Sequence, residues 1–154
     1  MGTRSTIALE YADGTVQQVY CHWDGYLAHN GQILAEHYSD PFKLRELIDL
    51  GDLSSLGTQI GHAHPFSPHG SKEDEALYEH AKDMGYCTFY GRDRGETCPA
   101  KTFKSYADYV ANHQYEEYEY ILRNVEGKAT WFVADHSDRY VTLAEAFVAE
   151  EETA

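Results

Sequence analysis

Residues 20–26 (Tyr-Cys-His-Trp-Asp-Gly-Tyr) combine three aromatic rings with a thiol, an imidazole, a carboxylate and a glycine. Such side chains serve nucleophilic and acid–base catalysis, and the rings can also stack on a ligand. The stretch closes a predicted strand over residues 16–23, on which Val19, Cys21 and Trp23 share the core face. Since Cys21 and His22 point to opposite faces, they cannot pair directly, and we expect a buried structural cysteine.

His22 and Asp24 are two residues apart and therefore lie on the same face of an extended backbone. A carboxylate that accepts from an imidazole orients and charges it, as in acid–base sites. We favour a simpler interpretation, in which a hydrogen bond pins the strand end and Asp24-Gly25 makes a turn. No catalytic residue is assigned. Tyr20, His22, Asp24 and Tyr26 remain candidates for contact with a ligand or a partner.

A second polar segment, residues 91–96 (Gly-Arg-Asp-Arg-Gly-Glu), follows a β-rich run and reads as a loop. Two guanidinium groups on such a loop suit a phosphate or carboxylate ligand. The alternating charges also allow internal salt bridges, in which Asp93 and Glu96 neutralise Arg92 and Arg94. We keep both interpretations, retain all four as candidate binding residues, and expect them to line one face with the aromatic stretch.

His62, His64 and His69 lie within residues 57–72, an irregular segment with several glycines and prolines that predicts a long surface loop. Zinc sites usually draw on tighter spacings that include cysteines or a helical histidine pair. The three cysteines are irregularly spaced and include no Cys-x-x-Cys motif. We therefore predict no metal, no other cofactor and no disulfide framework.

The chain carries 26 acidic and 12 basic side chains, a formal net charge of −14. Repulsion of the phosphate backbone disfavours direct binding of nucleic acid, whereas a basic protein could dock on an acidic surface. Excess acid can also simply keep a chain soluble. Alternating tyrosines and glutamates in residues 115–120 suit a strand edge that docks a basic partner, unless Tyr118 and Tyr120 face the core.

The sequence contains no apolar run that resembles a signal peptide or a membrane span. Three cysteines without a secretion signal suit a reducing compartment. We therefore expect a soluble cytoplasmic protein that does not engage a membrane.

The order of elements predicts one α+β domain over residues 1–148, followed by an acidic C-terminal tail, residues 149–154. We expect a mainly antiparallel sheet of about five strands with helices packed on one face. Asp13-Gly14 is a strong hairpin signal between the first two strands. The predicted strands are 5–11, 16–23, 86–90, 118–122 and 129–133, and the predicted helices are 27–38, 41–50, 72–84, 105–112 and one that begins at 143.

The predicted helix over residues 72–84 has a serine cap before it and a glycine at the position that follows it. Leu77, His80, Ala81 and Met84 recur on one side of this helix.

Several strings of the chain resemble a family of uncharacterised small proteins encoded by bacteriophages and some mobile elements. The most distinctive are residues 20–26 (YCHWDGY) and 90–96 (YGRDRGE), and the others are Thr3-Arg4-Ser5 with Ile7, Glu36-His37-Tyr38 and residues 50–57. Together they cover the N-terminal third and one later loop. The resemblance implies a phage origin and action in the cytoplasm of an infected bacterial host, and it implies no reaction.

The leading hypothesis is a phage-encoded accessory binding protein that antagonises a bacterial host defence or regulatory system. It would occupy a host protein through an acidic, tyrosine-rich surface. One alternative is a sponge for a small nucleotide signal, with Arg92 and Arg94 on phosphate and Tyr20, Trp23 or Tyr26 stacked on a base.

Another alternative is a small hydrolase or nucleotide-modifying enzyme that uses His22, Asp24 and the arginine-containing loop. We favour binding over catalysis, because the candidate residues do not form a recognisable catalytic set. A plain interaction role without antagonism is also compatible with the sequence, which leaves the oligomeric state open.

Overall fold

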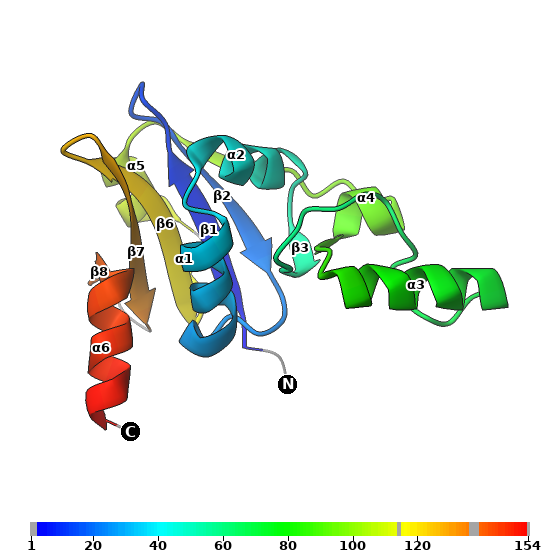
Figure 1. The fold of residues 1–154 in the computed structure, drawn as a ribbon. Helices are drawn as coiled ribbons and strands as arrows, with labels where there is room; N and C mark the ends of the chain where they lie inside the picture. The colour runs from blue at the N-terminus through cyan, green and yellow to red at the C-terminus, as the bar shows by residue number, and fades with distance from the viewer. Residues whose placement is uncertain (1–2, 114, 136–138, 154) are drawn as a thin grey trace.

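The computed structural model of the chain describes residues 3–113, 115–135 and 139–153. Its centre is a mixed eight-stranded sheet, in which seven strands follow the order β4-β3-β2-β1-β6-β7-β8 and β5 pairs with β2 (Figure 1). The strands are β1 Ser5–Glu10, β2 Val16–Cys21, β3 Leu53–Ser55, β4 Thr88–Phe89, β5 Lys101–Phe103, β6 Tyr118–Val125, β7 Lys128–Asp135 and β8 Val141–Thr142.

The predicted sheet of about five, mainly antiparallel strands is wrong. The described residues form eight strands, and two of the strand pairs are parallel: β1 with β6 and β2 with β3. The three strands that the sequence did not predict (β3, β5 and β8) are only two or three residues long, which is too short for a recognisable alternation of apolar residues.

Helices connect the strands and cover both faces of the sheet. In the described part of the chain they are the π-helical turn η1 Leu27–Gly31 and α1 Gln32–His37, α2 Pro41–Asp49, α3 Lys72–Met84, α4 Tyr90–Arg94, α5 Tyr106–Asn112 and α6 Leu143–Thr153. None of the described helices combines the length and the apolar character needed to cross a membrane. Helix α6 includes all three acidic residues that follow position 148.

The prediction that helices pack on one face is also wrong. Ile7 and Leu9 of β1 belong to the larger core, together with residues of α1 and α2, whereas Ala8 points into a smaller core with Tyr109 of α5. Figure 1 accordingly shows α1 and α2 on one side of the sheet and α5 on the other. A strand buried on both faces has no clean polar alternation.

Local signals are confirmed where a short motif determines the backbone. The Asp13-Gly14 hairpin forms, with the Tyr11 amide donating to the Thr15 carbonyl at 2.8 Å. Asp40 caps α2 by accepting from the Phe42 amide at 2.9 Å. Ser71 caps α3, and Gly85 ends it in the left-handed conformation that glycine tolerates.

Helix α3 differs from the other long elements because it is hardly packed. Ala81 is buried, but it is the only buried residue among the thirteen of α3, all of which are described. On the side that carries Ala81, Leu77 is 54% exposed and Met84 is 41% exposed. In Figure 1, α3 extends beyond the β4 edge and away from the sheet.

Candidate functional site

The two distinctive sequence strings lie next to each other at the β4 end of the sheet, joined by Asp52. The Asp52 carboxylate accepts from the Tyr20 amide at 2.9 Å, and the Asp52 carbonyl accepts from the Tyr90 amide at 3.2 Å. Burial raises the pKa of the Asp52 carboxyl, although the hydrogen bond from Tyr20 opposes this shift. The sequence interpretation missed Asp52, since nothing local marks it as a bridge between two distant segments.

Tyr20 and His22 form one polar pair on the same face of β2, as the alternation predicts. Tyr20 Oη lies 2.7 Å from His22 Nδ1, and burial raises the pKa of the Tyr20 phenol to about 12. Asp24 has a positive φ of 57°, so the extended backbone that would align it with His22 ends before it. The His22–Asp24 pair that we considered is therefore replaced by a His22–Tyr20 pair.

The other members of the aromatic stretch are divided between the core and the surface. Cys21 is fully buried as predicted, and Asn30 Nδ2 donates to its sulfur at 3.4 Å. Burial raises the pKa of the Cys21 thiol to about 12, which makes it a poor nucleophile. Trp23, predicted to lie in the core, is 43% exposed, and Tyr26 is 40% exposed at the start of η1.

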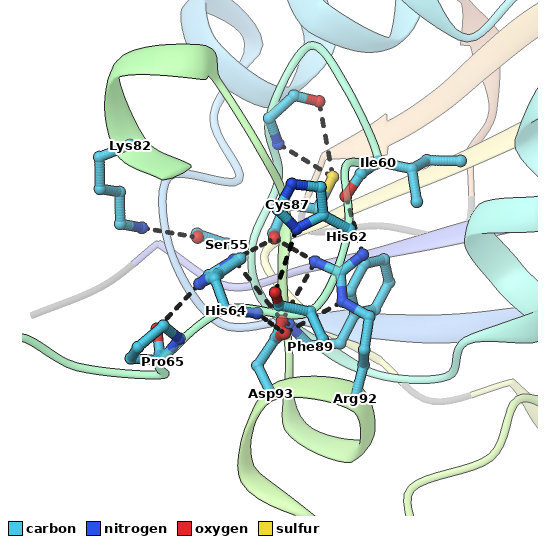
Figure 2. Close-up of polar contacts among 12 residues, drawn as sticks. Ser55, Ile60, His62, His64, Pro65, Lys82, Cys87, Phe89, Arg92 and Asp93 are labelled. Carbon is cyan, nitrogen blue, oxygen red and sulfur yellow. Dashed lines mark hydrogen bonds and ion pairs between the residues drawn. The ribbon is translucent and has the colours of Figure 1, made fainter. Parts of the chain in front are cut away.

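Arg92 and Asp93 form the centre of a buried clamp (Figure 2), which we define as His64, Cys87, Arg92 and Asp93. Arg92 Nε donates to Asp93 at 3.0 Å, Nη1 donates to the Ile60 carbonyl at 3.0 Å, and Nη2 donates to the Cys87 carbonyl at 2.9 Å. The Arg92 side chain is 12% exposed and that of Asp93 is completely buried. Each nitrogen of the guanidinium group thus has an acceptor within the protein.

Asp93 and His64 complete the clamp from the opposite side. The Asp93 carboxylate accepts from the amides of His64 at 3.1 Å and Phe89 at 2.8 Å. The His64 ring lies between two carbonyl oxygens, with Nε2 at 2.9 Å from Cys87 and Nδ1 at 2.8 Å from Pro65. These contacts fasten the loop after β3 to the free side of β4, so the clamp positions backbone and does not present a binding group.

Cys87 contributes both its carbonyl and its thiol to this region. The thiol lies 3.2 Å from the Gly57 amide and 3.4 Å from Tyr38 Oη, and burial raises the thiol pKa. A Cβ atom on Gly57 would lie 2.1 Å from the Gly85 carbonyl oxygen, so only glycine permits this approach. Close backbone contacts between Gly57 and Gly85 therefore hold the C-terminal end of α3, which we call its base.

Arg94 and Glu96 are exposed and pair with each other. The Arg94 guanidinium lies 4.4 Å from the centre of the Phe66 ring and 4.8 Å from that of Tyr90. This stack connects α4 to the loop before α3 by cation–π contacts. The predicted segment 91–96 is therefore a short helix with a left-handed Gly95 behind it, and two of its four charged residues are buried in the clamp.

Helix α3 leaves this base with its polar side chains in solvent. Its sequence holds five carboxylates and two lysines, and one of these lysines, Lys82, donates to Ser55 Oγ at 3.3 Å (Figure 2). Leu77, Ala81 and Met84 follow one another at i, i+4 and i+7 and so form one stripe. Ala81 is buried at the base, whereas Leu77 and Met84 remain exposed.

The tyrosine- and glutamate-rich segment is not a surface edge, which corrects that part of the sequence interpretation. Strand β6 lies between β1 and β7, and Tyr120 is fully buried. Glu119 is 1% exposed on the opposite face, where it pairs with buried His113 and accepts from Tyr140 Oη at 3.0 Å. Sequence reasoning missed this pairing because it joins the end of α5, strand β6 and the segment before β8, which no single local period connects.

The three loop histidines do not converge. The ring of His62 lies 5.0 Å from that of Tyr86, whereas His64 belongs to the clamp. His69 is exposed. In residues 3–113, 115–135 and 139–153, no group of three or more histidine, cysteine, aspartate or glutamate side chains has an arrangement that could hold a metal ion.

Comparisons with known proteins supply no relative for this chain. It matches no family model, no curated protein and no solved structure. The function is therefore inferred from the geometry of the molecule itself.

Proposed function

We propose that this protein is a binding protein that captures a basic protein partner on α3 and does not catalyse a reaction. In the setting that the phage resemblance implies, the partner is a host defence or regulatory protein in the bacterial cytoplasm, and its occupation antagonises that system. The observation that carries the proposal is that α3 projects from the sheet with one buried residue, Ala81.

A helix of thirteen residues gains little from its own hydrogen bonds, and packing normally supplies most of its stability. Helix α3 instead relies on the Ser71 cap, on carboxylates in its first turn and on Gly85 at its end. It exposes Leu77 and Met84, which a helix designed only for solubility would replace with polar residues. Exposed apolar side chains on a helix whose C-terminal end is fixed favour docking of a partner.

The charge of α3 specifies the chemistry of that partner. Glu75, Glu79 and Asp83 are exposed and form one acidic row at four-residue spacing on the side of α3 opposite the apolar stripe, and exposed Glu73 lies one turn before Leu77. Carboxylates on the helix that docks accelerate association with a basic surface through their long-range field, and they oppose acidic or phosphate-bearing partners. Leu77 and Met84 at the centre would then contribute the area removed from water.

The two alternatives receive less support from the same geometry. A nucleotide sponge requires free guanidinium forks, but Arg92 donates from every nitrogen to internal acceptors and Arg94 pairs with Glu96. A hydrolase that uses His22 and Asp24 requires contact between them, but His22 contacts Tyr20 and Asp24 follows a different backbone direction.

The test is affinity capture from host lysate, followed by calorimetric titration of the captured protein with purified variants. Glu79→Gln/Asp83→Asn should weaken binding about tenfold, and Leu77→Ala should weaken it by a similar factor without loss of helix propensity. Binding should also weaken as salt is raised. The matched control, Glu46→Gln/Glu151→Gln, changes the net charge equally at exposed positions outside α3 and should bind like the wild type.

Equal loss of affinity in both double variants would show that only net charge matters and would remove α3 from the interface. Turnover of a nucleotide that His22→Ala abolishes, with the fold intact by circular dichroism, would replace the binding proposal with the enzyme alternative.

A further inference from the structure

A hollow lies away from α3, at the hairpins that join the central strands. It is a groove of about 650 Å³ between the β1–β2 hairpin, the start of α2 and the β6–β7 hairpin. This volume falls within the range of about 300–1,000 Å³ that small-molecule sites occupy. The partner proposal does not use any residue of this groove.

The floor of the groove is apolar and belongs to the larger core. Leu9 and Leu122 are 4% and 1% exposed there, and Ala129 packs against the same core. Phe42 stands at the rim and is 79% exposed, the most exposed of the large apolar side chains. A flat apolar body placed in the groove would cover Phe42 and remove it from water.

The polar wall of the groove contains two arginines in different states. Arg123 donates to both carboxylate oxygens of Glu10, at 3.2 and 3.3 Å, so its charge is neutralised within the protein. Arg45 has no carboxylate within ion-pair distance among the described residues, and its guanidinium lies 5.9 Å from the centre of the Tyr11 ring.

Tyr11 is fixed beside Arg45 because its hydroxyl donates to Gln17 Oε1 at 2.6 Å. Tyr11 and Arg45 also line a second, smaller hollow with Asp13 and Asp49, and neither of these carboxylates is within ion-pair distance of Arg45. A guanidinium group without an ion-pair partner beside an apolar floor, in a chain of net charge −14, selects a ligand that brings its own negative charge.

We propose that this groove binds a small amphipathic organic anion, with a flat apolar body on Leu9, Leu122 and Phe42 and a carboxylate or sulfonate on Arg45. The two parts of the ligand match the two parts of the groove, because the floor is apolar and the wall offers Arg45, which has no ion pair among the described residues. The site is independent of α3 and of any protein partner.

The probe for this proposal is 1-anilinonaphthalene-8-sulfonate, an aromatic sulfonate, compared with its neutral analogue N-phenyl-1-naphthylamine. The full chain should bind the sulfonate saturably at one site, as measured by fluorescence titration. Arg45→Gln should weaken the sulfonate about tenfold and leave the affinity of the neutral analogue unchanged. Phe42→Ala should weaken both probes, because it removes a contact that they share.

Two controls separate this site from general dye binding. Lys72→Gln removes an equal charge from α3 and should change the affinity of neither probe. Amide shifts in NMR spectra should concentrate at Leu122 and Ala129 when the sulfonate is added. Equal sulfonate affinity in wild type and Arg45→Gln, non-saturable binding, or shifts located elsewhere would each overturn the proposal.

Discussion

At the β4 edge of the sheet, Arg92 is 12% exposed and donates to one carboxylate and two carbonyl groups, so its charge holds two segments of backbone together. At the hairpin end, Arg45 is exposed beside an apolar groove and has no ion-pair partner among the described residues. The residue type is the same in both regions, and the difference lies in the acceptors that the fold supplies. A guanidinium group is available to a ligand only where the protein has not already satisfied it.

The largest expected effect follows from removing the buried arginine. Arg92→Gln should lower the free energy of unfolding by about 3 kcal/mol, because it leaves the fully buried Asp93 carboxylate without its cation. Urea denaturation followed by circular dichroism measures this loss. The neighbouring Arg94→Gln is the matched control, and it should cause a much smaller loss because Arg94 pairs with Glu96 in solvent.

If Arg92→Gln and Arg94→Gln lower the free energy of unfolding equally, the clamp does not hold the β4 edge together. The same result would also weaken the claim that the clamp positions the base of α3.

An intermediate effect is expected at the cap of α3. Ser71→Ala should destabilise the helix by about 1 kcal/mol, since the Asp74 amide loses its side-chain acceptor. Helix α3 has little tertiary packing, so the change should appear as faster hydrogen exchange within α3 and a smaller change in global unfolding. Exposed Ser39, which bonds to the Ala35 carbonyl at the end of α1, is the control, and Ser39→Ala should leave exchange in α3 unaltered.

The smallest effect on stability is expected at the groove. Arg45→Gln should change the free energy of unfolding by no more than about 0.5 kcal/mol, because no ion pair is broken. Denaturation measured beside Arg92→Gln gives a direct comparison of one substitution at two sites. A loss of unfolding free energy in Arg45→Gln close to that in Arg92→Gln would mean that Arg45 stabilises the fold. Its guanidinium would then not be available to an anion in the groove.

Short motifs predicted backbone geometry wherever the cause is local. Asp13-Gly14 produced the hairpin, and Ser71 with Gly85 delimited α3, because each acts on atoms a few residues away. The predicted α+β class is correct, but the predicted number and pairing of the strands are not. The central β1–β6 pair joins segments that no local pattern connects, and β3, β5 and β8 are too short to be recognised from alternation.

The site residues show the same limit. In the sequence, Arg92 and Asp93 suit ligand binding, because their neighbours are glycines and a second arginine. Their actual acceptors and donors, at Ile60, His64 and Cys87, become visible only once the loop folds back along β4. The alternation on β2 did place Tyr20 and His22 on one face, but it extended too far and assigned Trp23 to the core.

The pairing of β1 with β6 has a consequence for how the chain is made. Ser5 lies opposite Tyr118, and Leu9 lies opposite Leu122, so the neighbour of β1 is synthesised more than a hundred residues after it. At about 5–20 residues per second, this delay is on the order of ten seconds. Throughout that time the nascent β1–β2 hairpin has an open edge, which makes the growing polypeptide a candidate for chaperone binding and for aggregation at high expression.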